Sequence, residues 1–176
     1  MNTFALHPSP IISAAYHCDQ HLNKMIIESA QLLCTSIYLT SQHHHFPPNF
    51  LYKPTHLAHP CTKWVCESTA NAIWLCELAI ALESERHIAL SKIEHQSIPL
   101  IKHLLAFYHT FPSSSLTPHV FCGPLRVQIR DWDSHKKYQV YYAIKHHQWV
   151  LDKGAGMSYK SRPIPSFMLP HLETSS

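Results

Sequence analysis

The chain has 176 residues, a net charge of +3, 45% hydrophobic residues and only 14% charged residues. This length suits one domain with its own core, and the composition excludes a disordered chain. Three glycines are too few for the turns of a β sandwich or barrel, and no apolar run reaches the roughly 18 residues of a membrane span. We therefore expect a single all-α domain over residues 1–176, a compact bundle of about four to five helices.

The cysteines and the start of the chain indicate a reducing compartment. There are six cysteines, but the first residues, Met-Asn-Thr-Phe-Ala-Leu, have neither the basic nor the long apolar region of a signal peptide. We therefore expect reduced thiols, most of them buried, in a cytoplasmic protein. The closest pair, Cys61 and Cys66, lacks the second pair that would complete a structural zinc site. No metal or other cofactor is predicted.

Apolar periodicity and the prolines predict the elements. Two early prolines favour an extended entry over residues 1–11. Helices are expected over residues 12–39 and 59–84, within residues 92–111 and over residues 133–153, with loops at 41–50 and 112–130 and an extended tail over 155–176. Asp133 is a typical N-cap for the last helix, and Gly154 is a typical C-terminal stop.

The first predicted helix carries a polar face. At helical spacing the positions i, i+4, i+7, i+11 and i+14 are occupied by His17, His21, Lys24, Glu28 and Gln31. Two imidazoles, an amine, a carboxylate and an amide in one row exceed what solvation requires, which suggests a site. The alternative is an ordinary surface, because Lys–Glu pairs at i,i+4 are common and the chain has 17 histidines.

The second predicted helix mixes rings and an amide. Trp64 and Asn71 share one stripe of this helix, Trp74 shares the neighbouring stripe with Asn71, and His59 stands at its start. A Trp beside an Asn is typical of core packing around one satisfied amide, or else of a pocket that stacks and hydrogen-bonds a planar ring. We expect a pocket between the first two helices that faces the last one.

Basic charge is concentrated near the carboxyl end. Residues 126–162 hold eight Lys and Arg against three Asp and Glu, a net charge of +5. Such a region attracts polyanions, and basic and aromatic side chains on one helix suit phosphate contact with ring stacking. The candidate nucleic-acid contacts are Lys136, Lys137, Tyr141 and Lys145. A membrane is not expected, and no protein partner can be inferred.

Two motifs resemble a group of phage and giant-virus proteins that have no assigned activity. Residues 17–33 match the pattern His-Cys-Asp-(Lys/Gln)-His followed by Lys-Met-Ile-x-Glu-(Ser/Thr)-Ala-Gln-Leu-Leu. Residues 59–75 match His-Pro-Cys-x-x-Trp-Val-x-Glu-Ser-x-x-Asn-x-x-Trp-Leu, and the chain starts with the group's Met-Asn-x-Phe. The resemblance covers nearly the whole length but implies no reaction.

Shorter motifs resemble the endonuclease V-type pyrimidine-dimer DNA glycosylases of phage. Asp19-Gln20-His21-Leu22 is followed by Glu28 at the spacing of that family's catalytic Glu, and residues 137–142 are similar to its Trp-Tyr-Lys-Tyr-Tyr. The resemblance implies a small all-helical glycosylase and AP lyase that acts on DNA rather than RNA, with Glu28 catalytic. The family's nucleophile, the α-amine of a Thr followed by Arg, has no match in Met1-Asn2-Thr3. The first predicted helix, residues 12–39, also lacks the family's phosphate-binding arginines.

We therefore expect DNA-repair-like or base-modifying chemistry with a different nucleophile. Imine chemistry needs a partly neutral amine beside a carboxylate, which Lys24 and Glu28 would supply, with His21 as a proton shuttle. His17, Gln31, His59, Trp64, Asn71 and Trp74 would bind substrate, and either Trp could stack a flipped base. One rival is a metal-dependent enzyme using His17, His21 and Glu28, although Lys24 between them would repel the ion. The other is a non-enzymatic nucleic-acid-binding module.

Overall fold

The computed structural model describes the backbone of residues 1–172 and the side chains of residues 1–170. Its helices are α1 (Pro10–Ala15), α2 (Asp19–Leu39), α3 (Pro60–Glu67), α4 (Thr69–Leu90), α5 (Ile98–Tyr108), α6 (Leu125–Gln128), α7 (Ser134–Lys153) and α8 (Leu169–Leu172), with a 3-10 turn at His43–His45. No strand occurs within residues 1–172, which confirms the all-α prediction. Five of these helices have eight or more residues, in agreement with the expected four to five.

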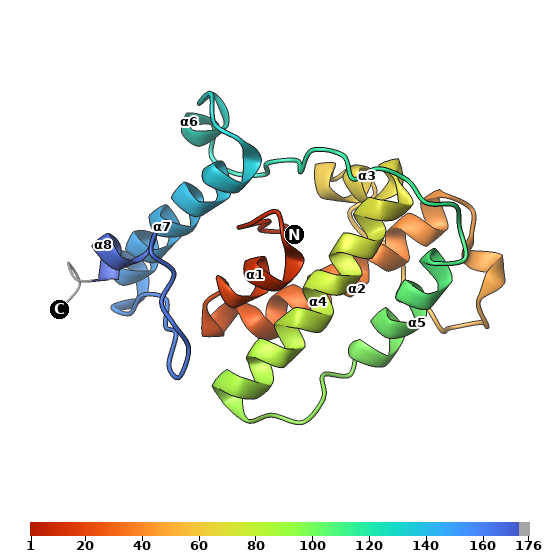
Figure 1. The fold of residues 1–176 in the computed structure, drawn as a ribbon, viewed down its shortest axis with the longest axis horizontal. Coiled ribbons are helices and arrows are strands. Elements are labelled where there is room, and N and C mark those ends of the chain that lie inside the picture. The colour runs from red at the N-terminus through yellow and green to blue at the C-terminus, as the bar shows by residue number, and fades with distance from the viewer. Residues whose placement is uncertain (173–176) are drawn as a thin grey trace.

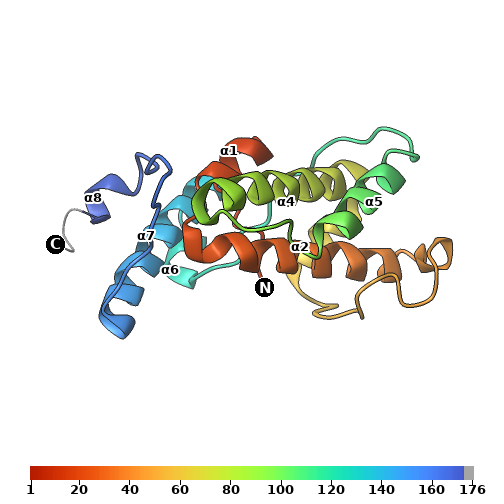
Figure 2. The same cartoon turned by 90° about the horizontal axis from the view of Figure 1, so that it is seen from below.

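The core forms around α2 and α4. These two helices pack on each other, α1 and α5 also pack on α4, and α3 packs on both (Figure 1). Their apolar faces bury side chains that include Leu22, Ile26, Leu33, Leu75 and Leu78. Figures 1 and 2 show α5 at one end of the molecule, with α7 and α8 at the other.

The amino-terminal segment, residues 1–6, attaches α7 to this core. Residues 2–6 are buried, and they contain no regular structure. From α7, His135 Nδ1 lies 2.8 Å from the carbonyl oxygen of Ala5, and the Gln139 amide donates to the carbonyl of Leu6 at 3.0 Å. The predicted entry contains no helix up to residue 9, but it is not extended throughout, because Phe4 has a φ of 42° and residues 7–9 form bends. Helix α1 begins at Pro10, inside the predicted entry, with Ser9 as its N-cap.

The single helix predicted over residues 12–39 is wrong, because the chain breaks between α1 and α2. Cys18 is extended (φ −69°, ψ 160°) and becomes the N-cap of α2. Two bonds from the tail hold the break: Arg162 donates to the carbonyl of His17 at 2.6 Å, and the Asp19 N–H donates to the carbonyl of Ser158 at 2.9 Å. Contacts with residues about 140 positions away therefore replace local helical bonds.

The helix predicted over residues 59–84 is also interrupted, at Ser68. This residue is extended (φ −154°), and its hydroxyl accepts the N–H of Asn71 at 3.1 Å as the N-cap of α4. The resulting bend between α3 and α4 is 117°. No single helix within residues 1–172 has the length and apolar character to cross a membrane, and α3 and α4 reach that length and character only as this bent pair.

The remaining elements largely agree with the sequence. The last helix has its predicted bounds, with the Asp133 carboxylate accepting the N–H of Lys136 at 2.9 Å and Gly154 at φ +67°. The 92–111 prediction contains α5. The loop predicted over residues 112–130 includes the short helix α6, and the predicted tail includes α8. Residues 173–176 of that tail lie outside the described part of the chain.

Candidate functional site

Glu28 lies on α2 beneath the amino-terminal segment. Its side chain is only 13% exposed, and Oε2 accepts the backbone N–H of Asn2 at 2.8 Å. Oε1 lies 3.7 Å from Nζ of Lys24, whose side chain is 65% exposed. The carboxylate is thus partly enclosed, as predicted, whereas the amine of Lys24 is in solvent at the rim. Such exposure does not provide the desolvation that a nucleophilic lysine needs.

Lys145 on α7 is half-buried and more enclosed than Lys24. Its Nζ lies 5.9, 5.6 and 5.6 Å from the ring centres of Phe4, Tyr141 and Trp149. Burial lowers the pKa of this lysine, and the charge of Lys24 lowers it further. Burial and a second cation favour the neutral amine, whereas the faces of the three rings favour the ammonium.

Other titratable groups around Lys145 act in both directions. Lys153, on the same helix, also lowers its pKa, whereas Cys18 and the carboxylate of Glu28 oppose the shift. Lys24 and Glu28 of α2 thus act electrostatically on Lys145 of α7. The sequence analysis assigned the amine to Lys24 and counted Lys145 among the nucleic-acid contacts.

His17 and His21 are core residues. Both are buried; His21 Nδ1 lies 2.6 Å from the Tyr142 hydroxyl, and His17 Nδ1 lies 2.7 Å from the carbonyl of Ser13. The ring of His21 also stacks on Phe4, with centroids 5.3 Å apart. Burial lowers the pKa of His17 to about 4 and that of His21 to about 2. Both rings are therefore neutral at pH 7, and His21 lacks the pKa of an efficient proton shuttle.

Acid should destabilise the fold through His21. Its folded-state pKa lies below the unfolded value of 6.5, so the unfolded chain binds the proton first and stability is lost as the pH falls below 6.5. Urea unfolding should show that between about pH 6 and pH 5 the wild type loses about 1 kcal/mol more than His21→Gln. The control is His44→Gln, the same change at an exposed position, and its free energy of unfolding should depend on pH as that of the wild type does. Parallel profiles for the wild type and His21→Gln would contradict this expectation.

Trp64, Asn71 and Trp74 lie in the core with His119. The ring of His119 stacks on Trp64 (4.7 Å between centroids) and meets Trp74 edge-on at 4.3 Å. The Trp74 indole N–H donates to the carbonyl of Pro8 at 2.7 Å. The sequence left two alternatives for Trp64 and Trp74, core packing or a pocket that stacks a planar ring. The structure shows core packing, with both indole rings buried by protein. The predicted stacking of a flipped base on either tryptophan is therefore not supported by their burial.

Asn71 is fully buried and connects α3, α4 and the loop that follows α5. Its amide donates to the carbonyl of Trp64 at 2.7 Å and to the Thr117 hydroxyl at 2.8 Å, and its Oδ1 accepts the Thr117 N–H at 2.9 Å. Asn71→Ala should lower the free energy of unfolding by about 2 kcal/mol, because buried partners lose their bonds. Gln148→Ala, which removes an exposed amide, is the control for urea unfolding and should change it by less than about 0.5 kcal/mol.

A third group of side chains was not predicted as a set. The ligand atoms of His59, Cys61 and Cys122 all lie within 4.8 Å of one another, and the two sulfur atoms are 3.5 Å apart. The hydrogen bond between the thiols, followed by burial, raises the pKa of Cys61, and the same bond lowers that of Cys122. Burial lowers the pKa of His59, an effect that the carboxylate of Glu28 opposes. Asn2 connects the cluster to Glu28, because its backbone N–H donates to Glu28 Oε2 and its side-chain amide donates to the carbonyl of Cys122.

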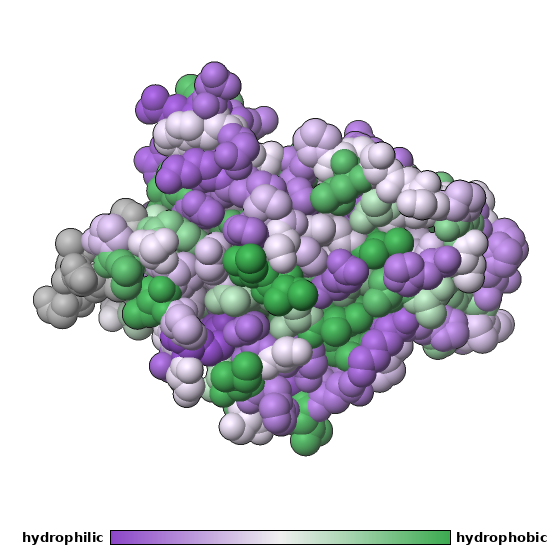
Figure 3. Space-filling view, viewed as in Figure 1, coloured by the Kyte–Doolittle hydropathy of each residue, from purple (hydrophilic) through white to green (hydrophobic). Residues whose placement is uncertain are grey.

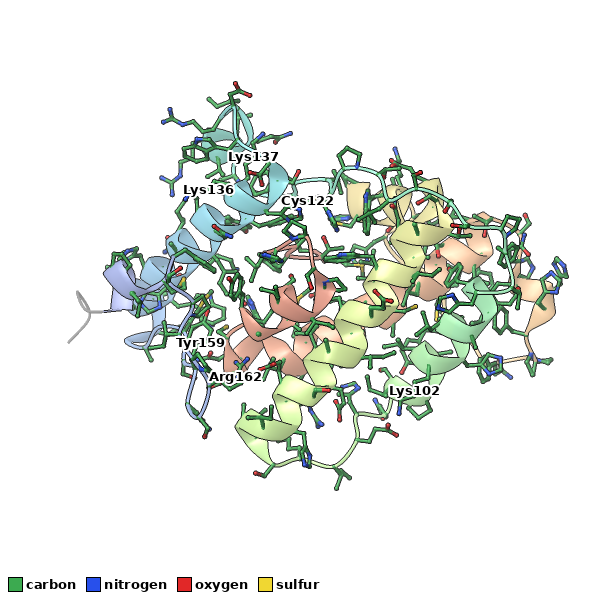
Figure 4. All side chains as sticks on the ribbon, in the orientation of Figure 1. Lys102, Cys122, Lys136, Lys137, Tyr159 and Arg162 are labelled. Carbon is green, nitrogen blue, oxygen red and sulfur yellow. The ribbon has the colours of Figure 1, made fainter. Side chains whose placement is uncertain are left out.

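The basic residues of the carboxyl-terminal region gather around α6 and the start of α7. Lys136, Arg126 and Arg130 are exposed, and Lys137 is partly exposed. The space-filling view shows a mainly hydrophilic surface over this part of the molecule, interrupted by exposed hydrophobic residues such as Leu125 and Ile129, and Lys136 and Lys137 project from the amino-terminal half of α7 (Figures 3 and 4). Lys136 and Lys137 are therefore available to a polyanion, as predicted.

The structure joins some predicted site residues and separates others. Glu28, Lys24 and Lys145 share one region, Tyr141 borders it, and Gln31 is half-buried one turn along α2 from Glu28. His17, His21 and Glu28 do not converge as a metal-ligand set: among the residues described, only the His59 cluster does. Phe4 was missed as a site residue, although it forms part of the Met-Asn-x-Phe start. Neither a family model, nor a curated protein, nor a solved structure matches this chain.

Proposed function

We propose that this protein is an imine-forming glycosylase or lyase that acts on nucleic acid, with Lys145 as the nucleophilic amine and Glu28 as the general acid and base. The observation that carries the proposal is the position of Lys145. Its amine is held among Phe4, Tyr141 and Trp149 and faces the charges of Lys24 and Glu28. Burial of the amine and the neighbouring ammonium of Lys24 favour the neutral form, which is the form that attacks carbon.

The proposed reaction uses these two groups in sequence. The neutral Nζ of Lys145 attacks C1′ of the sugar and displaces the base, or it condenses with the aldehyde of an abasic site and releases water. In the first case the C1′–O4′ bond then breaks as O4′ takes up a proton, so both routes give a protonated imine between Nζ and C1′. The carboxylate of Glu28 then removes a proton from C2′, the C3′–O bond breaks, and the 3′ phosphate leaves with the bonding electrons.

Substrate binding would use the surfaces on either side of Lys145. Tyr141 and Trp149 are partly exposed and can stack a base, and Lys145 lies over both rings. The exposed basic residues of α6 and the start of α7 would contact phosphates. The strand would therefore run along α7, with its sugar between Lys145 and Glu28.

Borohydride trapping on DNA with one abasic site tests the proposal. Wild-type protein should form a stable covalent adduct, because borohydride reduces the imine. Glu28→Gln should slow strand cleavage about 10²- to 10⁴-fold while the imine still forms, since general acid–base catalysis contributes about that factor. Glu77→Gln, at an exposed position of α4, is the matched control and should cleave at the wild-type rate. Absence of a wild-type adduct, or unchanged cleavage by Glu28→Gln, would contradict the proposal.

The net charge of +5 over residues 126–162 favours a second candidate, a non-enzymatic nucleic-acid-binding module. This candidate predicts salt-dependent DNA binding that Lys136→Ala weakens, together with no covalent adduct under any condition. The trapping experiment therefore separates the two functions.

A further inference from the structure

Three segments that are distant in sequence meet beside Glu28. His59 is the N-cap of α3, Cys61 lies in the first turn of that helix, and Cys122 lies on the loop before α6 (Figure 4). The amino-terminal segment joins them, since the Asn2 amide donates to the carbonyl of Cys122 at 2.6 Å and the Thr3 hydroxyl lies 4.0 Å from Cys61 Sγ. Two sulfur atoms and one imidazole therefore lie close together where α3, the loop before α6 and the amino-terminal segment are in contact.

The distances fit a tetrahedral metal ion. Sulfur ligands at about 2.3 Å from a tetrahedral zinc ion lie about 3.8 Å apart, and an imidazole nitrogen lies at a similar separation from each sulfur. The sulfur atoms of Cys61 and Cys122 are 3.5 Å apart, and the ligand atom of His59 lies within 4.8 Å of both. Small side-chain adjustments would complete three coordination bonds.

The surroundings hold the ligands in place. The Cys122 N–H donates to the Tyr138 hydroxyl at 3.1 Å, and that hydroxyl donates to the carbonyl of Val120 at 2.9 Å. His59 Nδ1 accepts the N–H of Cys61 at 3.2 Å, which keeps the ring against the start of α3. Metal binding would break this hydrogen bond from Cys61. If the metal binds Nε2, Nδ1 carries the proton and cannot accept; if the metal binds Nδ1, the lone pair that accepts the bond is used. The remaining contacts fix the loop that presents Cys122.

We propose that His59, Cys61 and Cys122 bind one Zn²⁺ ion. Two thiolates neutralise its charge, and soft sulfur ligands with one imidazole favour zinc over magnesium or calcium. Three protein ligands leave one open coordination position. The ion would link α3 to the loop before α6, and the amino-terminal segment contacts both through Asn2 and Thr3. This site lies beside Glu28 but uses none of the residues proposed for the amine chemistry of Lys145, and it is tested by metal content rather than by activity.

The experiment is metal analysis of reduced protein without a polyhistidine tag, after incubation with Zn²⁺ and gel filtration. Wild-type protein should retain about one equivalent, and Cys61→Ser, Cys122→Ser and His59→Asn should each retain less than about a tenth. Cys66→Ser, a partly buried cysteine of the same helix α3 outside the cluster, is the matched control and should retain the wild-type amount. Far-ultraviolet circular dichroism identifies any variant that fails to fold.

A second readout concerns the ligands themselves. Co²⁺-loaded wild-type protein and Cys66→Ser should show the near-ultraviolet charge-transfer band of a thiolate ligand, and this band should weaken in folded Cys122→Ser. Retention below about a tenth of an equivalent by reduced wild-type protein would overturn the proposal. So would full retention by folded Cys122→Ser, or a Cys61–Cys122 disulfide that forms in the presence of zinc.

Discussion

Arg162→Met is expected to lower the free energy of unfolding by about 3–5 kcal/mol. The side chain of Arg162 is 2% exposed, and its guanidinium lies 2.8 Å from Asp19 and 3.2 Å from Glu85. It also donates to the carbonyl of His17 at 2.6 Å, the bond that holds the break between α1 and α2. Removing the cation leaves the 5% exposed carboxylate of Asp19 without its charge partner, which is the costly form of a buried ion pair.

Urea unfolding of paired variants would show that the effect comes from this ion pair. Lys160→Met removes an exposed cation two positions earlier and should change the free energy of unfolding by less than about 0.5 kcal/mol. Adding Asp19→Asn to Arg162→Met should restore part of the loss, because the unpaired carboxylate is gone. A loss below about 1 kcal/mol in Arg162→Met would show that the tail does not hold α2 in this way.

Lys145→Met should reduce imine formation on abasic DNA by at least about 10³-fold. Methionine keeps much of the apolar contact with Phe4, Tyr141 and Trp149 but has no nucleophilic nitrogen. Lys102→Met is the control, because Lys102 projects from α5 at the far end of the molecule (Figure 4) and pairs there with Glu94 at 2.7 Å. The rate of adduct formation, measured at saturating DNA with borohydride present, should be unchanged in this control.

Lys24→Met distinguishes the two amines of the site. Because the charge of Lys24 lowers the pKa of Lys145, its removal should raise that pKa and shift the pH dependence of adduct formation to higher pH. The adduct should still form. Loss of the adduct in Lys24→Met, with adduct retained in Lys145→Met, would return the nucleophile to Lys24.

Helix ends were predicted correctly where residues close in sequence form the hydrogen bonds that cap them. Both ends of α7 were correct because Asp133 and Gly154 cap the helix with their own side chain and backbone. The break before α2 was missed because Arg162 and Ser158 supply the competing bonds from the tail. At Ser68 the N-cap was present in the sequence, but apolar periodicity on both sides suggested one continuous helix.

The site was predictable in part for the same reason. Helical spacing placed Lys24 and Glu28 on one face of α2, and aromatic residues interleaved with lysines indicated Lys145 on α7 as a nucleic-acid contact. Spacing does not report solvent exposure, so Lys24 was taken as the amine although its side chain is exposed and that of Lys145 is half-buried. The cluster with Cys122 could not be predicted either, because its members meet through tertiary contacts of the amino-terminal segment.

The most direct measurement is the identification of the modified residue by mass spectrometry after borohydride trapping on abasic DNA and digestion of the adduct. If an amine between the rings of Tyr141 and Trp149 performs the attack, the reduced sugar remnant will be found on Lys145. A remnant on Lys24 or on any other amine, or no remnant from wild-type protein, would contradict the account.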